Sequence, residues 1–524
     1  MFLINKIFNK FETLSFLFVL KSADKIFYDF SRKKWKKNPH KEIKGEVLTD
    51  FLFEDYYNFH VSYVVNFFYK NYDLIPKYYH FIPREKPFLR FLFGLMRKFT
   101  RINKLYSSFG SDFAFGQKKF KKSKLILNSL QFDSKKELLN YQIDGTRIGD
   151  LIYDTYLRKY QLPTVELSDK RLYIIILNAL DIYFSCEEYL EAHNVKKVVL
   201  SHAVYINYGI LARVALKKGI DVYNIHFERV FHKLSMDHFV PTLRHSLYTE
   251  IFSGFSFKEK ERCRLLAKKI LEERLEGKVD RGIAYMRESP YQNNEIQQNI
   301  FLNNGKPKVV LMLHCFYDAP HVYKNMLFED FFEWFDFVLS RVEKMDVDFV
   351  VKPHPNGKPY NEGIIKDFQQ KYPEVRFIDK KTSNKQIISE NISALLTVYG
   401  SIANEFAYLG IPVLLAGDNP TSAYKFCYIA KSKIEYDYYL LNISELKNKL
   451  DLSKSAIKEF FYMHYLHKHM GRIKGNNDLF NVRMRDNTDA NTNMFLELVQ
   501  DAKNGHFDNV FSGFEESLSQ LDEY

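Results

Sequence analysis

A cation and an imidazole follow directly on an apolar segment of the chain. The run VDFVVKPHP, residues 347–355, has the apolar character of a buried strand and ends on Lys352, His354 and Pro355. A lysine and a histidine at a strand end mark either an ordinary exit into a loop or a place where an anionic ligand is held. Other candidate ligand-binding residues in the chain distinguish between these two interpretations.

A second group of candidate residues lies about 45 residues further along, at a glycine-serine step. Tyr399 closes the apolar run SALLTVY, and Gly400 precedes a segment with helical spacing that starts at Ser401. Glycine lets a backbone approach a ligand, and the first turn of a helix directs free N–H groups toward it. Ser401 either holds a ligand there or caps the helix. Glu405 lies on the same helix face and either accepts ribose hydroxyls or pairs on a solvated surface.

Both groups belong to a repeated pattern in which apolar strands end in polar residues. Residues 307–420 alternate five expected strands with helices over short connections, which predicts a doubly wound α/β domain. Ligands of such domains bind outside the carboxyl ends of the strands. The sequence therefore predicts a site for phosphate, ribose and base at the five strand ends. They carry His314, then Lys352 with His354, then Asp379, then Tyr399 to Ser401, then Asp418.

The segments KPHP and LTVYGSIANEFAYLGIPVLLAGDNP resemble the donor half of GT-B glycosyltransferases. The resemblance is closest to the bacterial capsule and surface-polysaccharide families that include the β-Kdo transferases. Polymerases that transfer polyol phosphate from CDP-activated donors share a similar arrangement. The resemblance implies that His354 contacts the donor phosphate with Lys352 as counter-charge, that Ser401 also holds phosphate, and that Glu405 binds the ribose. It also implies that no cofactor and no bound metal are needed.

The N-terminal half is expected to supply the catalytic group. VKKVVLSH, residues 195–202, predicts a strand that ends on His202, and a helix and a second strand follow over residues 206–227. Transfer to an acceptor hydroxyl needs a general base, or a carboxylate nucleophile in a double displacement. His202 is either that base or a satisfied strand-end histidine, and Asp150 is either catalytic or a helix cap. The full set of candidates is Asp144, Asp150, Asp154, His202, His226 and Glu228.

Histidines cluster at two further places. HCFYDAPH predicts a cleft loop in which His314, Asp318 and His321 touch the donor or acceptor, with loop structure and then metal binding as the alternatives. The segment FFYMHYLHKHMGRIKG favours an aromatic helix that crosses back onto the N-terminal domain over a metal cluster. Its histidines are His464, His467 and His469.

The formal net charge of +12 suggests an acidic partner. The densest basic runs are residues 32–37 and 118–124, in which Trp35 and Phe120 are interleaved. Aromatic side chains among lysines suit anionic lipid headgroups, and a solvated surface is the alternative. No nucleic-acid signature is present, and no run approaches the roughly 20 apolar residues of a membrane span. Four scattered cysteines favour a reduced, cytoplasmic setting. Together with the basic runs, this predicts a protein that is peripheral on the inner face of a bacterial plasma membrane.

The length of 524 residues predicts two main domains. We expect a GT-B-like α/β fold of two Rossmann-like domains facing across a cleft. The predicted parts are an acceptor-side domain over 1–287, a linker over 288–305, a donor domain over 306–455 and a helical segment over 456–524 that packs back on the first domain. The predicted function is transfer of a sugar from a CMP-, UDP- or GDP-sugar to a bacterial surface polysaccharide or lipid-linked glycan. The alternatives are a CDP-glycerol or CDP-ribitol phosphotransferase and a non-catalytic glycan-binding scaffold.

Overall fold

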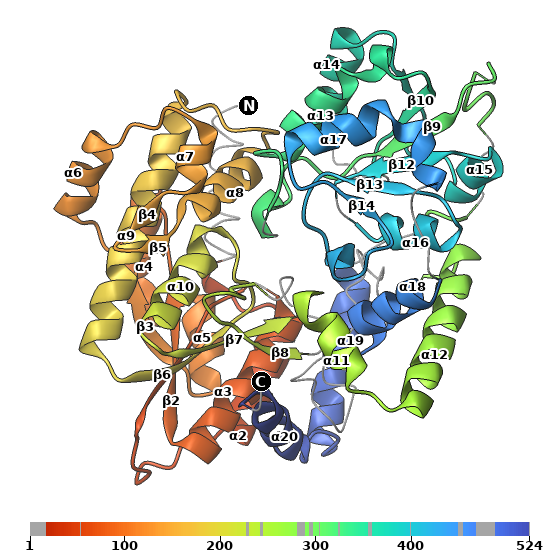
Figure 1. Ribbon diagram of the computed structural model, residues 1–524. Helices are drawn as coiled ribbons and strands as arrows, with labels where there is room; N and C mark the ends of the chain where they lie inside the picture. The colour runs from red at the N-terminus through yellow and green to blue at the C-terminus, as the bar shows by residue number, and fades with distance from the viewer. Residues whose placement is uncertain are drawn as a thin grey trace.

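Two six-stranded sheets, one in each half of the chain, organise the molecule (Figure 1). The computed structural model describes residues 17–522 apart from 53, 227–229, 241–244, 280–288, 293–296, 303, 323–324, 355–358, 399, 449–453 and 468–487. Each sheet with its helices forms one lobe in Figure 1, the first in orange to lime and the second in green to blue.

The first sheet has the order β3-β2-β1-β6-β7-β8. Five of its strands are parallel, and β8 pairs antiparallel with β7. Counted along the chain this is the strand order 3-2-1-4-5-6 of the Rossmann fold. The strands are β1 (Gly45–Thr49), β2 (Leu74–His80), β3 (Asp112–Gly116), β6 (Val195–Leu200), β7 (Asp221–His226) and β8 (Val230–Lys233).

The second sheet has the order β11-β10-β9-β12-β13-β14, which is again 3-2-1-4-5-6, and all its pairs are parallel. The molecule is therefore an α/β protein of two Rossmann-like domains, as predicted. The strands are β9 (Lys308–Met312), β10 (Asp348–Lys352), β11 (Arg376–Phe377), β12 (Ala394–Thr397), β13 (Val413–Leu415) and β14 (Tyr428–Ile429). A short hairpin of β4 (Gln142–Ile143) and β5 (Thr146–Arg147) lies apart from both sheets.

Helices cover both faces of each sheet, which explains why the strands are apolar on both sides. Along β9, Val309 and Leu311 point into one core cluster and Val310 and Met312 into the other. The first cluster is closed by α13 (Phe331–Leu339), α14 (Pro359–Lys371) and α17 (Lys433–Leu441). The second cluster is closed by α11 (Tyr248–Ser253), α12 (Phe257–Leu275), α15 (Asn384–Ser389), α16 (Ile402–Tyr408) and α18 (Lys454–Phe461).

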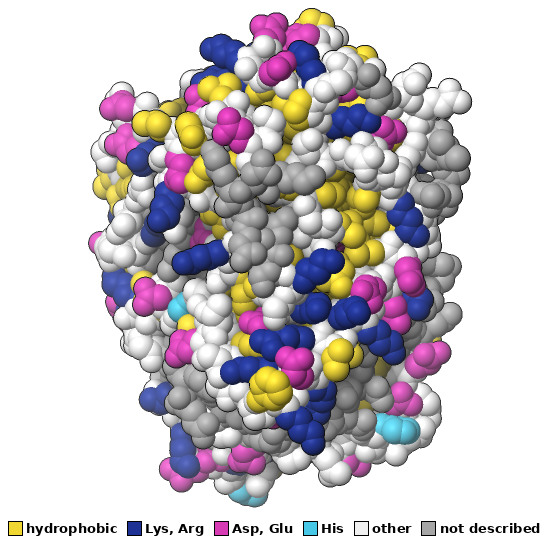
Figure 2. All heavy atoms as spheres, turned by 45° about the vertical axis from the view of Figure 1, so that its right-hand side comes forward, with side chains coloured by type: hydrophobic (Ala, Val, Ile, Leu, Met, Phe, Trp, Pro, Cys, Tyr) yellow, Lys and Arg dark blue, Asp and Glu magenta, His cyan; other side chains and the backbone are white. Residues whose placement is uncertain are grey.

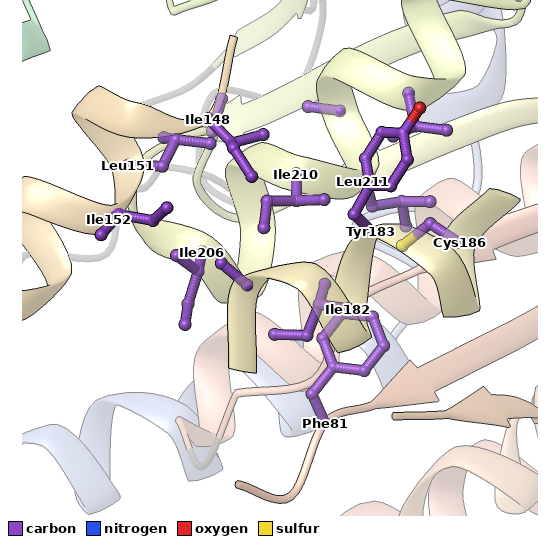
Figure 3. Close-up of a cluster of buried hydrophobic side chains, with 14 of the residues drawn as sticks. Phe81, Ile148, Leu151, Ile152, Ile182, Tyr183, Cys186, Ile206, Ile210 and Leu211 are labelled. Carbon is purple, nitrogen blue, oxygen red and sulfur yellow. The ribbon is translucent and has the colours of Figure 1, made fainter. Parts of the chain in front are cut away.

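One face of the first sheet packs against α8 (Gly149–Tyr160), α9 (Lys170–Ala192) and α10 (Ile210–Lys217). Figure 3 shows this core, in which Leu151, Ile182 and Ile210 come from the three different helices. The other face packs against α2 (Ser22–Lys34), α3 (Asp55–Tyr72) and α5 (Arg101–Ser108). The remaining helices of this domain are α4 (Pro87–Met96), α6 (Lys121–Ser129) and α7 (Lys135–Leu139).

Packing differs from the predicted domain boundaries on both sides of the second domain. Most of α18 lies in the segment expected to pack on the first domain, but its Phe460 and Phe461 belong to the core of the second. Helices α11 and α12 fall inside the predicted first domain, but Cys263 and Leu271 of α12 belong to the core of the second. Tyr291, in the predicted linker, is also buried, and its hydroxyl contacts Glu405 of the second domain. The C-terminal helices α19 (Thr488–Lys503) and α20 (Val510–Asp522) pack beside α2 and β8 of the first domain (Figure 1).

The two aromatic side chains in the basic runs do not lie at an outer surface. Trp35 is only 5% exposed, and its ring meets that of Tyr63 edge-on with the centroids 4.8 Å apart. Phe120 is partly buried against Phe184, with the ring centroids 5.6 Å apart. The predicted lipid-facing role is therefore wrong for Trp35, because its indole fills the core between α2 and α3. Within the described residues, no helix is both long and apolar enough to cross a bilayer.

Candidate functional site

A cavity of about 100 Å³ opens at the carboxyl edge of the second sheet. It lies where strand order reverses between β9 and β12, the place where ligands of such sheets bind. The end of strand β10 supplies three of its lining residues, because the buried run DFVVK ends there at Lys352. The lining residues are Pro290, Met312, Leu313, His314, Lys352, Pro353, His354, Asn384, Thr397, Gly400, Ser401, Ile402 and Glu405.

Lys352 is the buried cation of this cavity. It is 4% exposed, and its Nζ donates a hydrogen bond of 2.5 Å to Oδ1 of Asn384. Among the described residues it forms no ion pair. Burial lowers the pKa of Lys352 to about 7, although the charge of Asp379 acts in the opposite direction. An anion in the cavity would favour the charged amino group and raise this pKa.

Two imidazoles stand beside Lys352. The ring centroids of His354 and His314 are 5.8 Å apart, so the ends of β10 and β9 bring together residues 40 positions apart in sequence. Burial, followed by the neighbouring His314 and Lys352, lowers the pKa of His354 to about 3. Burial also lowers the pKa of His314. Both rings are therefore neutral at pH 7, and the Nδ1 of His314 lies 3.4 Å from the carbonyl of Cys315.

The glycine-serine step lines the same cavity. Gly400 has a φ of +148°, and no heavy atom lies within 4 Å of the position that a Cβ would take. The backbone is thus open toward the cavity at this position. Ser401 precedes α16, and its side chain makes no capping hydrogen bond to that helix. The predicted alternative, in which the hydroxyl caps the helix, is therefore wrong.

Glu405 lines the same cavity but is held by protein donors on both oxygens. Arg274 of α12 donates to Oε1 at 3.1 Å, and the hydroxyl of Tyr291 donates to Oε2 at 2.7 Å. Arg274 is itself fully buried, with its guanidinium over the rings of Phe461 and Tyr465. The predicted contact of Glu405 with a ribose remains a prediction, since a carboxylate can still accept further bonds.

A second cavity of about 250 Å³ adjoins the first and shares His314 and His354 with it. Asp379 lines this cavity from an exposed position at the end of β11. Pro355 and Tyr399, both predicted for the donor site, lie outside the described residues. The predicted donor residues that are described therefore come together around two connected cavities.

The carboxyl edge of the first sheet carries a chain of hydrogen bonds that ends on His202. Nδ1 of His202 lies 2.9 Å from Oγ of Ser201, and the Ser201 hydroxyl donates to the carboxylate of Asp50. The hydroxyl donates its single proton to Asp50, so its lone pair accepts from Nδ1–H of His202. This assignment makes Nε2 the basic nitrogen of the ring. His202 is partly exposed and lies over Tyr208.

Asp50 is the residue of this edge that the sequence reasoning missed. It follows β1 directly, is 1% exposed, and accepts from the backbone N–H of Ser201 and the hydroxyl of Tyr57. Burial raises the pKa of Asp50 to about 6, against the hydrogen bonds from Ser201 and Tyr57 that lower it. The signal was available, because GEVLTD is a short apolar strand followed by a polar residue, as at the other strand ends.

The other acidic candidates of the first domain have different surroundings. Asp150 is buried and takes two hydrogen bonds of 2.6 and 2.7 Å from Arg213. Burial alone would raise the pKa of Asp150, but Arg213 and Arg147 hold it at about 2. A carboxylate held there is a weak base, so this geometry favours a structural ion pair. Asp144 lies at the exposed tip of the β4–β5 hairpin and lines neither donor cavity.

The loop after β9 reaches across to the first domain. Nδ1 of His321 lies 2.5 Å from Oδ1 of Asp154, and its Nε2 lies 2.9 Å from the carbonyl of Glu329. Burial lowers the pKa of His321, but the adjacent Asp154 more than offsets this and leaves it raised. Asp318 of the same loop is exposed. Of the three predicted loop residues, His314 thus faces the donor cavity and His321 joins the two domains.

A larger cavity of about 700 Å³ lies between the domains beside this contact. Its walls combine Phe239 and Arg147 of the first domain with Phe328 and Lys433 of the second. The two lobes therefore face each other across a cleft, which completes the GT-B-like architecture. Aromatic and polar side chains together suit a carbohydrate, whose ring faces are apolar and whose hydroxyls need partners.

In the described part of the chain, no three His, Cys, Asp or Glu side chains are placed to hold a metal ion. His464 instead lies 2.9 Å from the Tyr248 hydroxyl and stacks on Phe460. Glu228 and His469 lie outside the described residues, as does the side chain of His226.

No protein-family model and no curated protein matches the chain. Among solved structures, it is similar to two KpsC enzymes of Thermosulfurimonas dismutans. The beta Kdo 2,4 transferase is 12% identical over 52% of this chain and 81% of that one, with a TM-score of 0.32. The beta Kdo 2,7 transferase is 14% identical over 55% and 85%, with a TM-score of 0.29.

A UDP-GlcNAc 2-epimerase from Neisseria meningitidis, bound to UDP-GlcNAc, is 14% identical over 78% of this chain and 97% of that one, with a TM-score of 0.21. At these identities and TM-scores, the likenesses say nothing about the donor, the acceptor or the reaction.

Proposed function

We propose that this protein is a glycosyltransferase that moves a sugar from a nucleotide-activated donor onto a surface glycan or a lipid-linked glycan. The observation that supports it most is the buried amino group of Lys352 at the carboxyl edge of the second sheet, with His314 and His354 beside it. A lysine held there without an ion pair among the described residues is destabilised as a cation. A diphosphate in the cavity would remove that cost.

The donor half would act by stabilising negative charge on the departing nucleotide. Lys352 supplies the positive charge, and His354, being neutral, supplies an N–H donor. Ser401, which also lines the cavity, adds its hydroxyl, which makes no capping bond. Donors that are fixed before the reaction are worth more in a cavity shielded from water than in solution. Glu405 is proposed to contact the ribose while Arg274 and Tyr291 hold it in place.

The acceptor half would act through His202. The acceptor hydroxyl gives its proton to Nε2, its oxygen forms a bond to the anomeric carbon, and the bond from that carbon to the phosphate oxygen breaks. Asp50 acts through Ser201 as a positioning residue, because the chain of hydrogen bonds fixes the tautomer of His202. The acceptor would enter along the cavity between the domains, where Phe239 and Phe328 offer apolar surface.

A thermal-shift panel with CMP, CDP, UDP and GDP tests the donor half directly. Binding to the folded state raises the melting temperature, and we expect at least one of the four nucleotides to do so. If none of them stabilises the protein, the enzyme proposal fails and a non-catalytic role is favoured.

The nucleotide that binds then decides which donors to offer. Release of that nucleotide from a sugar donor supports the glycosyltransferase. Release of CMP from CDP-glycerol or CDP-ribitol alone would show a polyol phosphotransferase instead. We place either activity at the inner face of a bacterial plasma membrane, where a lipid-linked acceptor is presented.

A further inference from the structure

Helix α4, Pro87–Met96, has no buried residue. Its largest apolar side chains are exposed, with Phe88 at 57%, Phe91 at 66% and Leu95 at 70%. Their spacing of three and four residues places them on one face of the helix. Phe99, in the short turn that follows, is 63% exposed. Large apolar side chains exposed together on one helix face mark an interaction site.

Other exposed apolar side chains of the protein are distributed differently. Phe257 and Leu265 lie on α12, where charged residues surround them, whereas Ile434, Tyr438 and Leu441 form an exposed row on α17. Figure 2 shows the face that the second domain turns outward, and basic and acidic side chains are interspersed over it. Hydrophobic side chains are also present on this face. Helix α4 differs from α17 because it has no buried residue.

Basic side chains surround α4. Lys86 and Lys98 are exposed at its two ends. Arg90 donates to the carbonyl of Gln117 and Arg84 to the carbonyl of Phe120, so the basic run over 118–124 is held against the start of the helix. The exposed lysines of that run are Lys118, Lys119, Lys121, Lys122 and Lys124. Lys118 is paired with Glu188 and Arg84 with Asp181, so the positive charge of these surroundings comes mainly from the other lysines. That charge complements an anionic surface.

The position of α4 relates this surface to the proposed acceptor site. The helix begins seven residues after β2 ends at His80. Strand β2 is parallel to β1, and β1 is parallel to β6, so the three strands end at one edge of the sheet. That edge carries Asp50 and His202. A membrane that lies against α4 would hold a lipid-linked acceptor on the His202 side of the molecule.

We infer that α4 is an interfacial helix that lies in the headgroup region of an anionic phospholipid bilayer. Phe88, Phe91 and Leu95 enter the acyl boundary, and the lysines of residues 118–124 lie on lipid phosphates. The inference rests on the proposed function, since membrane binding by α4 serves the transfer if the acceptor is linked to a lipid. It replaces Trp35 as the basis for membrane contact, because that indole is buried.

Flotation with lipid vesicles tests the inference without any nucleotide. The intact chain is mixed with vesicles of equal parts phosphatidylglycerol and phosphatidylethanolamine, or of phosphatidylcholine alone. We expect it to float with the anionic vesicles and to stay behind with the neutral ones. The combined variant Phe88→Ser, Phe91→Ser and Leu95→Ser should lower partitioning at least about tenfold, because each exposed side chain loses its apolar burial.

The matched control removes the same number of exposed apolar side chains from the second domain. In the variant Phe257→Ser, Leu265→Ser and Ile434→Ser, vesicle binding should equal that of the wild type. Both triple variants change exposed residues, so their melting temperatures should stay close to the wild-type value, and nucleotide stabilisation should persist in each. A nucleotide-binding protein that ignores vesicles would thus separate a failure of this inference from a failure of the proposed function.

Three outcomes would overturn the inference. The first is a wild type that does not float with anionic vesicles, and the second is an α4 variant that floats as well as the wild type. The third is a wild type that forms dimers in sedimentation velocity, with dimerisation lost in the α4 variant and vesicle binding unchanged. That result would assign α4 to contact with a second copy of the chain.

Discussion

The carboxyl edges of the two sheets have the same strand order behind them but opposite chemistry. The edge of the second sheet gathers Lys352, His314 and His354 around a cavity, where burial works against positive charge. The edge of the first sheet gathers Asp50, Ser201 and His202 into one chain of hydrogen bonds. The first arrangement is suited to binding an anion, and the second to accepting a proton. In the proposed function, one fold used twice would supply the two complementary halves of a group transfer.

Replacing His202 should separate the two edges most strongly. His202→Gln removes the proposed base, and kcat should fall by about 10² to 10⁴ while nucleotide binding stays unchanged. His193→Gln is the control, because His193 precedes the amino end of the same strand and should leave kcat as it is. Steady-state kinetics, with the donor that the nucleotide-release assay selects, measures kcat for both variants. Equal kcat in the two variants would remove His202 from the chemistry.

Replacing Lys352 tests the other edge. Lys352→Met keeps the length of the side chain but removes its charge, and nucleotide affinity should fall by about 10- to 100-fold. Lys344→Met, an exposed lysine that precedes the amino end of the same strand, should bind as the wild type does. Calorimetric titration of the stabilising nucleotide gives both constants. Unchanged affinity in Lys352→Met would contradict a phosphate contact there.

The pH dependence of nucleotide affinity should report the protonation of Lys352. Its pKa is lowered to about 7, so below pH 7 the amino group is already charged and affinity is at its maximum. Above pH 7 the group must take up a proton on binding, and affinity should fall by up to about tenfold per pH unit. Nucleotide phosphates lose their last proton near pH 6 and add little above pH 7. Fluorescence or calorimetric titrations between pH 6.5 and about 9 would show this slope.

Replacing one residue of a contact between the two domains should have the smallest effect. The Tyr153 hydroxyl donates to Oδ2 of Asp330 at 2.6 Å, which joins α8 to the start of α13. Tyr153→Phe should lower the free energy of unfolding by about 1 to 2 kcal/mol, because a buried carboxylate loses one donor. Tyr173→Phe, at an exposed position on α9, is the control. Denaturant unfolding compares the variants, and equal stability would rule out a structural role for this contact.

The second domain could be predicted from sequence because its signals are local. Strands such as KVVLM and DFVVK are continuously apolar, short helices separate them, and Lys352 and Gly400 mark the ends by residue type alone. Parallel strands put those ends at one edge, so residues far apart in sequence came together as expected. The partners of Glu405 could not be predicted, since Arg274 and Tyr291 arrive from α12 and the expected linker.

The first domain was harder because its pattern is obscured by aromatic residues. Helix α3 reads DYYNFHVSYVVNFFYKNY and is apolar over most of its length, so its period gives no outer face. Strands β1 to β3 lie among such segments, so neither these strands nor Asp50 at the end of β1 was predicted from the sequence. The basic runs show the same limit: composition placed lysines beside Trp35, but only packing shows which side chain faces inward.

Proton uptake on nucleotide binding tests the central claim most directly. Calorimetric titration of the stabilising nucleotide at pH 8, in buffers of different ionisation enthalpy, counts the protons taken up. With a free-state pKa of about 7, Lys352 is mostly neutral at that pH, so the wild type should take up close to one proton. Lys352→Met should take up none, and Lys344→Met should match the wild type. Equal uptake by wild type and Lys352→Met, or none by either, would contradict an anion site built on this buried lysine.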